Sequence, residues 1–117
     1  MKVKNGRNNF LSLASKKAID VLNYNNNNGF FLMIENDFID HAHHNTRASA
    51  SLLETMILDE AVEMALGLVS TDDTLIIVTS DHSHTMTMGG FQTRGSDIRG
   101  LVDNDLGKDN LPYNILS

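Results

Sequence analysis

The stretch GFFLMIENDFIDHAHH, residues 29–44, and the stretch TLIIVTSDHSH, residues 74–84, follow one pattern. Each begins with an apolar run and passes directly into acidic residues and histidines. The two apolar runs, residues 29–34 and 74–79, carry no charge and are rich in aromatic or β-branched side chains. Such runs are typical of strands that are buried on both faces of a parallel sheet. We therefore expect two strands of this kind.

Helical patterns stand before the first apolar run and between the two runs. Apolar residues recur at helical spacing over residues 11–22, and residues 46–69 carry a longer stripe with the period of an α-helix. The order helix, strand, helix, strand predicts a right-handed βαβ unit with parallel strands, within an α/β fold. After residue 88 we expect irregular chain, with residues 113–116 as the one further candidate strand.

The composition narrows the function classes. A chain of 117 residues is one domain or part of one. The net charge of −6 argues against nucleic acid or an anionic membrane as the main partner. The absence of cysteine excludes disulfides, thiolate zinc sites and cysteine nucleophiles. No apolar run approaches the roughly 20 residues of a membrane span, and the N-terminal residues do not resemble a signal peptide.

All five histidines directly follow the two apolar runs, three after the first and two after the second. Ligands of open parallel sheets bind beyond the carboxyl ends of the strands, so both groups are expected to meet at one edge. Carboxylate and imidazole together suit zinc, and a corner rich in carboxylates suits magnesium. Asp40 and His44 are four residues apart and would share one face of a helix.

Blander interpretations of these residues stay open at this point. A single histidine more often makes a structural hydrogen bond than binds a metal, and acidic residues after a strand often form a solvated loop or a helix cap. Ser83 lies between two histidines, but no Gly-x-Ser-x-Gly elbow surrounds it, which argues against a nucleophile there.

These residues closely resemble the alkaline phosphatases of animals. The resemblance lies in GFFLMIE (residues 29–35), IDHAHH (residues 39–44) and the segment from Asp73 to TSDHSH (residues 79–84), and continues in IRGL and PYNIL further on. It extends from about residue 11 to the C-terminus. It implies that residues 1–117 are a fragment of a single alkaline phosphatase domain, from the later half of the enzyme, with part of a three-layer α/β sandwich.

The resemblance also implies roles for individual residues. Those that match metal ligands of the family are Glu35 for magnesium, Asp40 and His44 for the first zinc, and Asp81 and His82 for the second zinc. His84 matches a histidine that orients a zinc-bound carboxylate. The chain departs from the family after the glutamate, where two glycines and a basic residue are usual and Asn36, Asp37 and Phe38 stand instead.

For function, the resemblance implies hydrolysis of phosphate monoesters with two zinc ions and one magnesium ion. Family members are commonly homodimers, and commonly secreted or anchored at the outer surface of the membrane. The nucleophilic serine of the family, its phosphate-binding arginine and a third zinc histidine have no match here. We therefore expect a metal-binding portion that is inactive by itself. The alternatives are a non-catalytic divalent-metal-binding module and a remnant that acts only through interactions.

Overall fold

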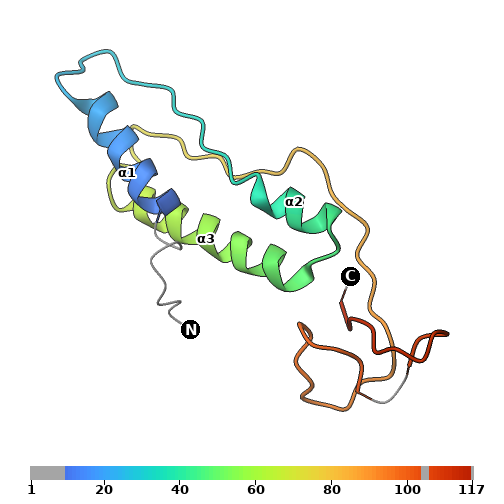
Figure 1. Ribbon diagram of the computed structural model, residues 1–117. Helices are drawn as coiled ribbons and strands as arrows, with labels where there is room; N and C mark the ends of the chain where they lie inside the picture. The colour runs from blue at the N-terminus through green and yellow to red at the C-terminus, as the bar shows by residue number, and fades with distance from the viewer. Residues whose placement is uncertain (1–9, 104–105, 117) are drawn as a thin grey trace. The chain divides into compact units, whose positions relative to one another are not determined.

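The computed structural model describes residues 10–103 and 106–116 and contains three helices (Figure 1). Helix α1 comprises Phe10–Asn23, α2 comprises Phe38–His44 and α3 comprises Ala48–Leu66. The two longer helices predicted from the sequence are confirmed as α1 and α3. Within the described residues, no helix combines the length and the apolar character needed to cross a bilayer.

The predicted βαβ unit is wrong. The structure assigns no strand within residues 10–103 and 106–116, so this chain does not form an α/β sandwich with parallel strands. Residues 29–34 and 74–79 are extended but form no ladder (Figure 1). The candidate strand at residues 113–116 is also absent, and only two isolated antiparallel bridges occur in the described chain, Met88 with Leu116 and Leu101 with Asn114.

The exposure of side chains explains why the extended segments do not behave as buried strands. Phe31 and Met33 are 88% and 80% exposed, and Leu75 and Ile77 are 82% and 74% exposed. Of the alternate apolar side chains, Phe30, Leu32 and Ile76 are half-buried, whereas Ile34 and Val78 are exposed. A run that is apolar throughout can be buried on both faces only if a layer covers each face, and two extended segments without further partners make at best a marginal sheet. Here only some of the side chains on one face of each segment are partly covered.

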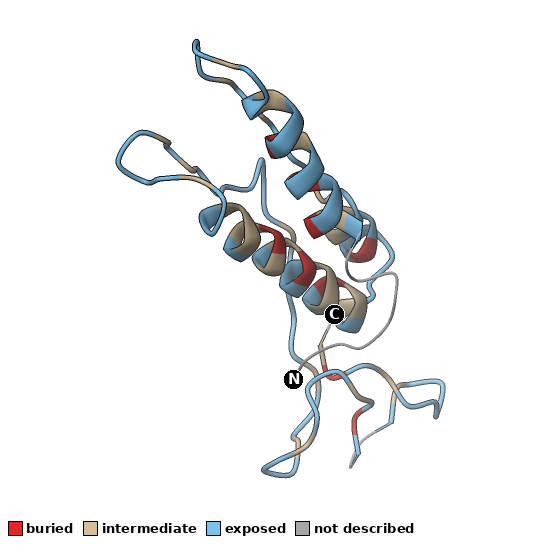
Figure 2. Cartoon of the chain, turned by 90° about the vertical axis from the view of Figure 1, so that its left-hand side faces the viewer, coloured by how far each residue is buried: buried red, intermediate tan, exposed pale blue. Residues whose placement is uncertain are grey.

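The described chain divides into two units, and the first comprises residues 10–37 and 53–79. Its core lies between α1 and α3, where Ile19, Ile57 and Ala61 are buried (Figure 2). The facing side chains are small or branched, which allows the two helices to approach closely. This unit therefore rests on one helix pair, to which the extended segments are added.

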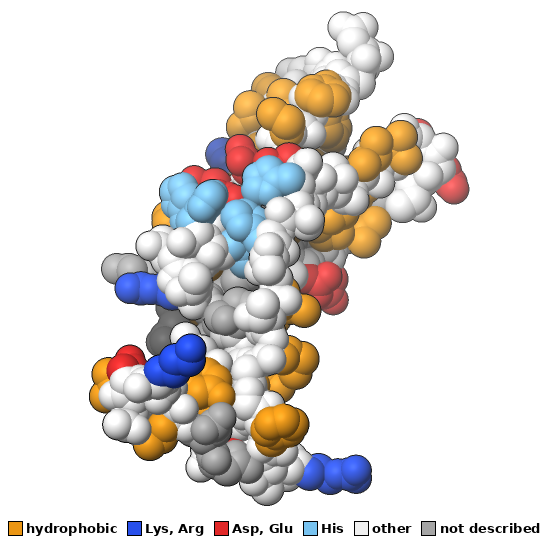
Figure 3. All heavy atoms as spheres, turned by 90° about the vertical axis from the view of Figure 1, so that its right-hand side faces the viewer, with side chains coloured by type: hydrophobic (Ala, Val, Ile, Leu, Met, Phe, Trp, Pro, Cys, Tyr) orange, Lys and Arg blue, Asp and Glu red, His pale blue; other side chains and the backbone are white. Residues whose placement is uncertain are grey.

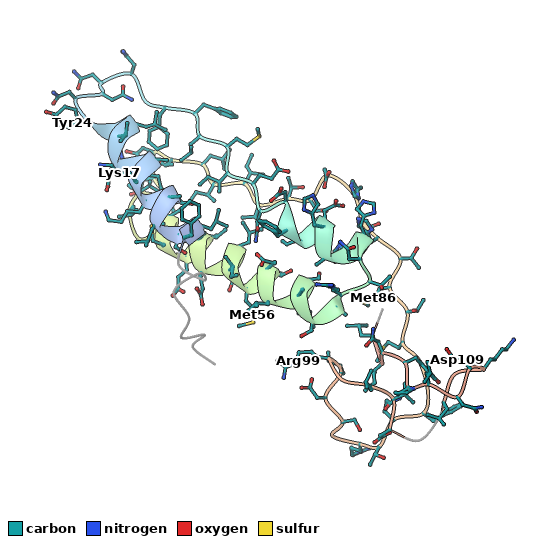
Figure 4. All side chains as sticks on the ribbon, viewed as in Figure 1. Lys17, Tyr24, Met56, Met86, Arg99 and Asp109 are labelled. Carbon is teal, nitrogen blue, oxygen red and sulfur yellow. The ribbon has the colours of Figure 1, made fainter. Side chains whose placement is uncertain are left out.

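The second unit comprises residues 38–52 and 80–116, apart from 104–105. Its C-terminal half is held by backbone hydrogen bonds, including Gly89 N to Ile115 O at 2.8 Å and Val102 N to Tyr113 O at 2.8 Å. A Cβ at Gly89 would lie 2.7 Å from the ring of Tyr113, so only glycine fits this close approach. Figure 4 shows the loops of this half, with Arg99 and Asp109 on different turns.

Candidate metal centre

The candidate centre begins on α2, which carries an acidic residue and a histidine one helical turn apart. Asp40 and His44 lie on one face of this helix, with His44 Nε2 at 3.4 Å from Asp40 Oδ2. The sequence predicted a shared face only if a helix started near Asp40, and α2 starts at Phe38. Local helix geometry is therefore enough to bring this pair together.

The segment that follows residue 79 brings the second group of ligands to the same carboxylate. His84 Nε2 donates a hydrogen bond to Asp40 Oδ1 at 2.7 Å. His82 Nε2 lies 3.6 Å from the same oxygen and 3.4 Å from Oδ2 of Asp81. The structure thus places three histidines, His44, His82 and His84, around the carboxylate of Asp40, whereas Asp81 contacts, among these residues, only His82.

Two kinds of distance occur among these side chains. In a tetrahedral zinc site with bonds of roughly 2.0 to 2.2 Å, two ligand atoms lie about 3.4 Å apart. The pairs Asp40–His44 and Asp81–His82 both have this separation, at 3.4 Å each. The 2.7 Å between His84 and Asp40 is shorter and matches a charge-assisted hydrogen bond. The donor set therefore fits a divalent metal.

Three of these residues form the group of potential metal-binding side chains found among the described residues. Asp40, His82 and His84 each offer one ligand atom, and these atoms lie within 4.8 Å of one another. Imidazole nitrogens and one carboxylate oxygen, with no sulfur, are a donor set that suits zinc or another borderline divalent ion.

The charge of Asp40 is stabilised by its neighbours. The hydrogen bond from His84 lowers the pKa of Asp40 below its ordinary value, and positive charge on the surrounding imidazoles lowers the pKa further. Partial loss of hydration opposes the change. Asp40 is therefore held in the ionised form that a metal ligand requires.

His84 lies at the middle of a cluster of imidazole rings. Its ring centroid is 4.8 Å from that of His43, 4.9 Å from that of His44 and 5.0 Å from that of His82. Its side chain is 22% exposed, less than the side chains of His44 and His82. Figure 3 shows imidazole side chains gathered on one face of the molecule.

Sequence reasoning missed the support that α3 gives to this cluster. Ser51 is buried, and its Oγ lies 2.6 Å from Nε2 of His43. The contact depends on the turn between α2 and α3, where Arg47 N donates to Ala42 O and Thr46 adopts a positive φ of 51°. A β-branched residue rarely adopts this conformation, so the sequence held no clear signal for the turn.

Glu35 lies outside the unit that carries this group. It is exposed and belongs to the first unit, whereas the other predicted ligands belong to the second. Asn36 is one of the residues that depart from the family pattern. Its Nδ2 donates a hydrogen bond to Glu54 O at 2.9 Å, which links the chain after Glu35 to α3. Phe38 is 60% exposed and meets the ring of His41 edge-on at 5.7 Å.

Comparisons with known proteins identify the family of this chain. Residues 2–114 match the family model of alkaline phosphatase. The chain is 42% identical over 100 residues to a membrane-bound alkaline phosphatase of Bombyx mori, a match that covers 86% of this chain and 18% of that protein. It is 43% identical over 96 residues to the tissue-nonspecific isozyme of Homo sapiens, over 82% of this chain and 18% of that protein.

A third relative matches nearly the whole chain. The tissue-nonspecific isozyme of Rattus norvegicus is 37% identical over 116 residues, which cover 97% of this chain and 22% of the rat protein. This chain therefore belongs to the alkaline phosphatase family. It spans about a fifth of the length of these curated relatives.

Proposed function

We propose that this chain supplies part of the zinc ligands of an alkaline phosphatase that hydrolyses phosphate monoesters. One observation carries the proposal. Two acid–imidazole pairs, Asp40 with His44 and Asp81 with His82, each have a ligand separation of 3.4 Å, and His82 lies 3.6 Å from Asp40. Two pairs with ligand spacing that meet at one carboxylate are what a centre for two neighbouring ions requires.

Each side chain has a role in this proposal. Asp40 and His44 hold one zinc, Asp81 and His82 hold the other, and His84 orients the carboxylate of Asp40 through its hydrogen bond. Glu35 contributes to a magnesium site, as its place in the family motif implies. Bound zinc would supply Lewis-acid stabilisation for the attacking and leaving oxygens of phosphoryl transfer.

The chain's own contribution is to hold and orient these ligands. The short helix α2 fixes the spacing of Asp40 and His44, and the bond from His84 keeps the carboxylate of Asp40 turned toward the second group of ligands. Arg99 forms a local ion pair with Asp97, with Nη2 of Arg99 at 2.6 Å from Oδ2 of Asp97. The proposal assigns no nucleophile to this chain.

Zinc titration by calorimetry tests the proposal. We expect the folded chain to take up two zinc ions at neutral pH, and His44→Ala and His82→Ala each to remove one. His41→Ala is the matched control, because His41 is an exposed histidine of the same helix whose ring meets Phe38. No zinc uptake by the folded wild type, or equal losses in all three variants, would contradict the assignment.

A further inference from the structure

The contact between Ser51 and His43 links α3 to the candidate centre. Ser51 is 7% exposed, and its hydroxyl lies 2.6 Å from Nε2 of His43. A buried hydroxyl at this distance restricts the rotation of the imidazole, because the hydrogen bond between the two atoms is lost when the ring turns away.

The restricted ring of His43 in turn packs against His84. The two ring centroids are 4.8 Å apart with the planes inclined at 47°. His84 then donates to Asp40 at 2.7 Å. All four residues belong to the second unit, so one continuous series of contacts leads from the first turn of α3 to the carboxylate.

We infer that Ser51 and His43 are positioning residues of this centre, which act on Asp40 through His84 without touching the metal. The inference rests on the proposed function and deepens it. Partners of this kind matter because an orienting histidine that can rotate no longer holds its carboxylate in the geometry for binding. Loss of such partners typically weakens metal affinity by about 10- to 100-fold.

The test uses four single variants of the chain and one double variant, which combines Ser51→Ala with His43→Phe. Ser51→Ala removes the hydroxyl, Ser51→Thr keeps it, and His43→Phe keeps a ring but removes the bond. Ser49→Ala is the control, since Ser49 is an exposed serine in the same turn of α3. Each variant is measured without metal by long-range ¹H–¹⁵N spectra of the imidazole rings, and by zinc titration.

We expect Ser51→Ala to shift the ring signals of His43 and His84 and to weaken zinc binding by about tenfold, the low end of the usual range, because the effect passes through two rings. Ser51→Thr and Ser49→Ala should match the wild type. His43→Phe should equal Ser51→Ala, and the double variant should lose no more, because the two residues act in one series.

The possible failures are distinguishable. Wild-type ring spectra and zinc affinity in Ser51→Ala, or equal losses in Ser51→Ala and Ser49→Ala, would overturn the inference and leave the proposed function standing. No zinc uptake by the wild type would refute the proposed function, and the His84 signals of the metal-free variants would then decide whether Ser51 positions this ring. If Ser51→Ala does not fold, His43→Phe gives the answer.

Discussion

Replacing His84 by glutamine and by alanine separates an orienting histidine from a metal ligand. The Nε2 of His84 lies 2.7 Å from Asp40, a hydrogen-bond distance that is too short for two ligands of one tetrahedral ion. Glutamine places an N–H donor at about the same reach from the backbone, but it lacks the ring nitrogen that binds zinc well. We therefore expect glutamine to retain most of the zinc affinity and alanine to lose it.

The size of the effect follows from the number of ligands. Structural zinc sites with four ligands have apparent binding free energies of roughly 10 to 16 kcal/mol. A zinc site with two protein ligands should have about half of this binding free energy, which corresponds to a Kd of about 1 to 200 μM. An orienting role predicts a further loss of about 10- to 100-fold in His84→Ala, and a change of no more than about threefold in His84→Gln.

Competition titration with a coloured zinc chelator covers this affinity range, and far-UV circular dichroism verifies that α2 and α3 persist in each variant. If glutamine weakens binding as much as alanine, the ring nitrogen of His84 is itself a ligand and our assignment by distance is wrong. If neither substitution weakens binding, the bond to Asp40 has no role in the centre.

Four further predictions concern charge, association and activity. Zinc affinity should fall steeply below about pH 6, because imidazole must be neutral to bind metal, and calorimetry at several pH values measures this. The hydrogen bonds from Arg99 lower the pKa of Asp97 to about 2, so the attraction of this pair is fully present above the ordinary carboxyl pKa and is lost as the pH falls toward 2; carboxyl ¹³C spectra should show a normal titration in Arg99→Gln. The exposed apolar side chains of residues 29–34 and 74–79 should make the chain self-associate, and the double variant Phe31→Lys, Ile77→Lys should have a lower mass by light scattering. Because no nucleophile is assigned here, the purified chain with zinc should not hydrolyse a chromogenic phosphate monoester at the roughly 1 to 1,000 per second typical of enzymes.

The helices could be predicted because their signal is local. In α1 and α3 the apolar residues repeat at the helical period, and the buried Ile19, Ile57 and Ala61 belong to the predicted stripes. Only the boundaries differed, since the longer predicted helix, residues 46–69, is observed as Ala48–Leu66. Helical hydrogen bonds close within the segment, so the pattern of the segment is nearly sufficient.

The sheet could not be predicted from the same kind of evidence. An apolar run such as residues 74–79 indicates that its side chains favour burial. A strand also needs a backbone partner, and burial of both faces needs two covering layers. In the described chain only Ile76 of these apolar side chains is half-buried, and Leu75, Ile77 and Val78 are exposed. Composition alone does not report whether the covering layers are within the same chain.

The candidate site was predictable to the extent that it depends on short spacings. The step from Asp40 to His44 needs one helical turn, and the step from His82 to His84 needs two residues of chain. Ser51 was missed because its contact with His43 depends on the positive φ of Thr46. Threonine rarely adopts this conformation, and no pattern of polar residues predicts it.

The meeting of the two histidine groups has a different cause from the one that the sequence suggested. We expected the carboxyl ends of two paired strands to bring them to one edge, yet they meet in a chain whose described residues contain no strand. The observed link is the 2.7 Å bond from His84 to Asp40, supported by the rings of His43 and His44 around His84. Side-chain hydrogen bonding within the centre therefore holds the ligands of this unit together, and the centre should be sensitive to substitutions of His84 and insensitive to substitutions in the exposed rows of the extended segments.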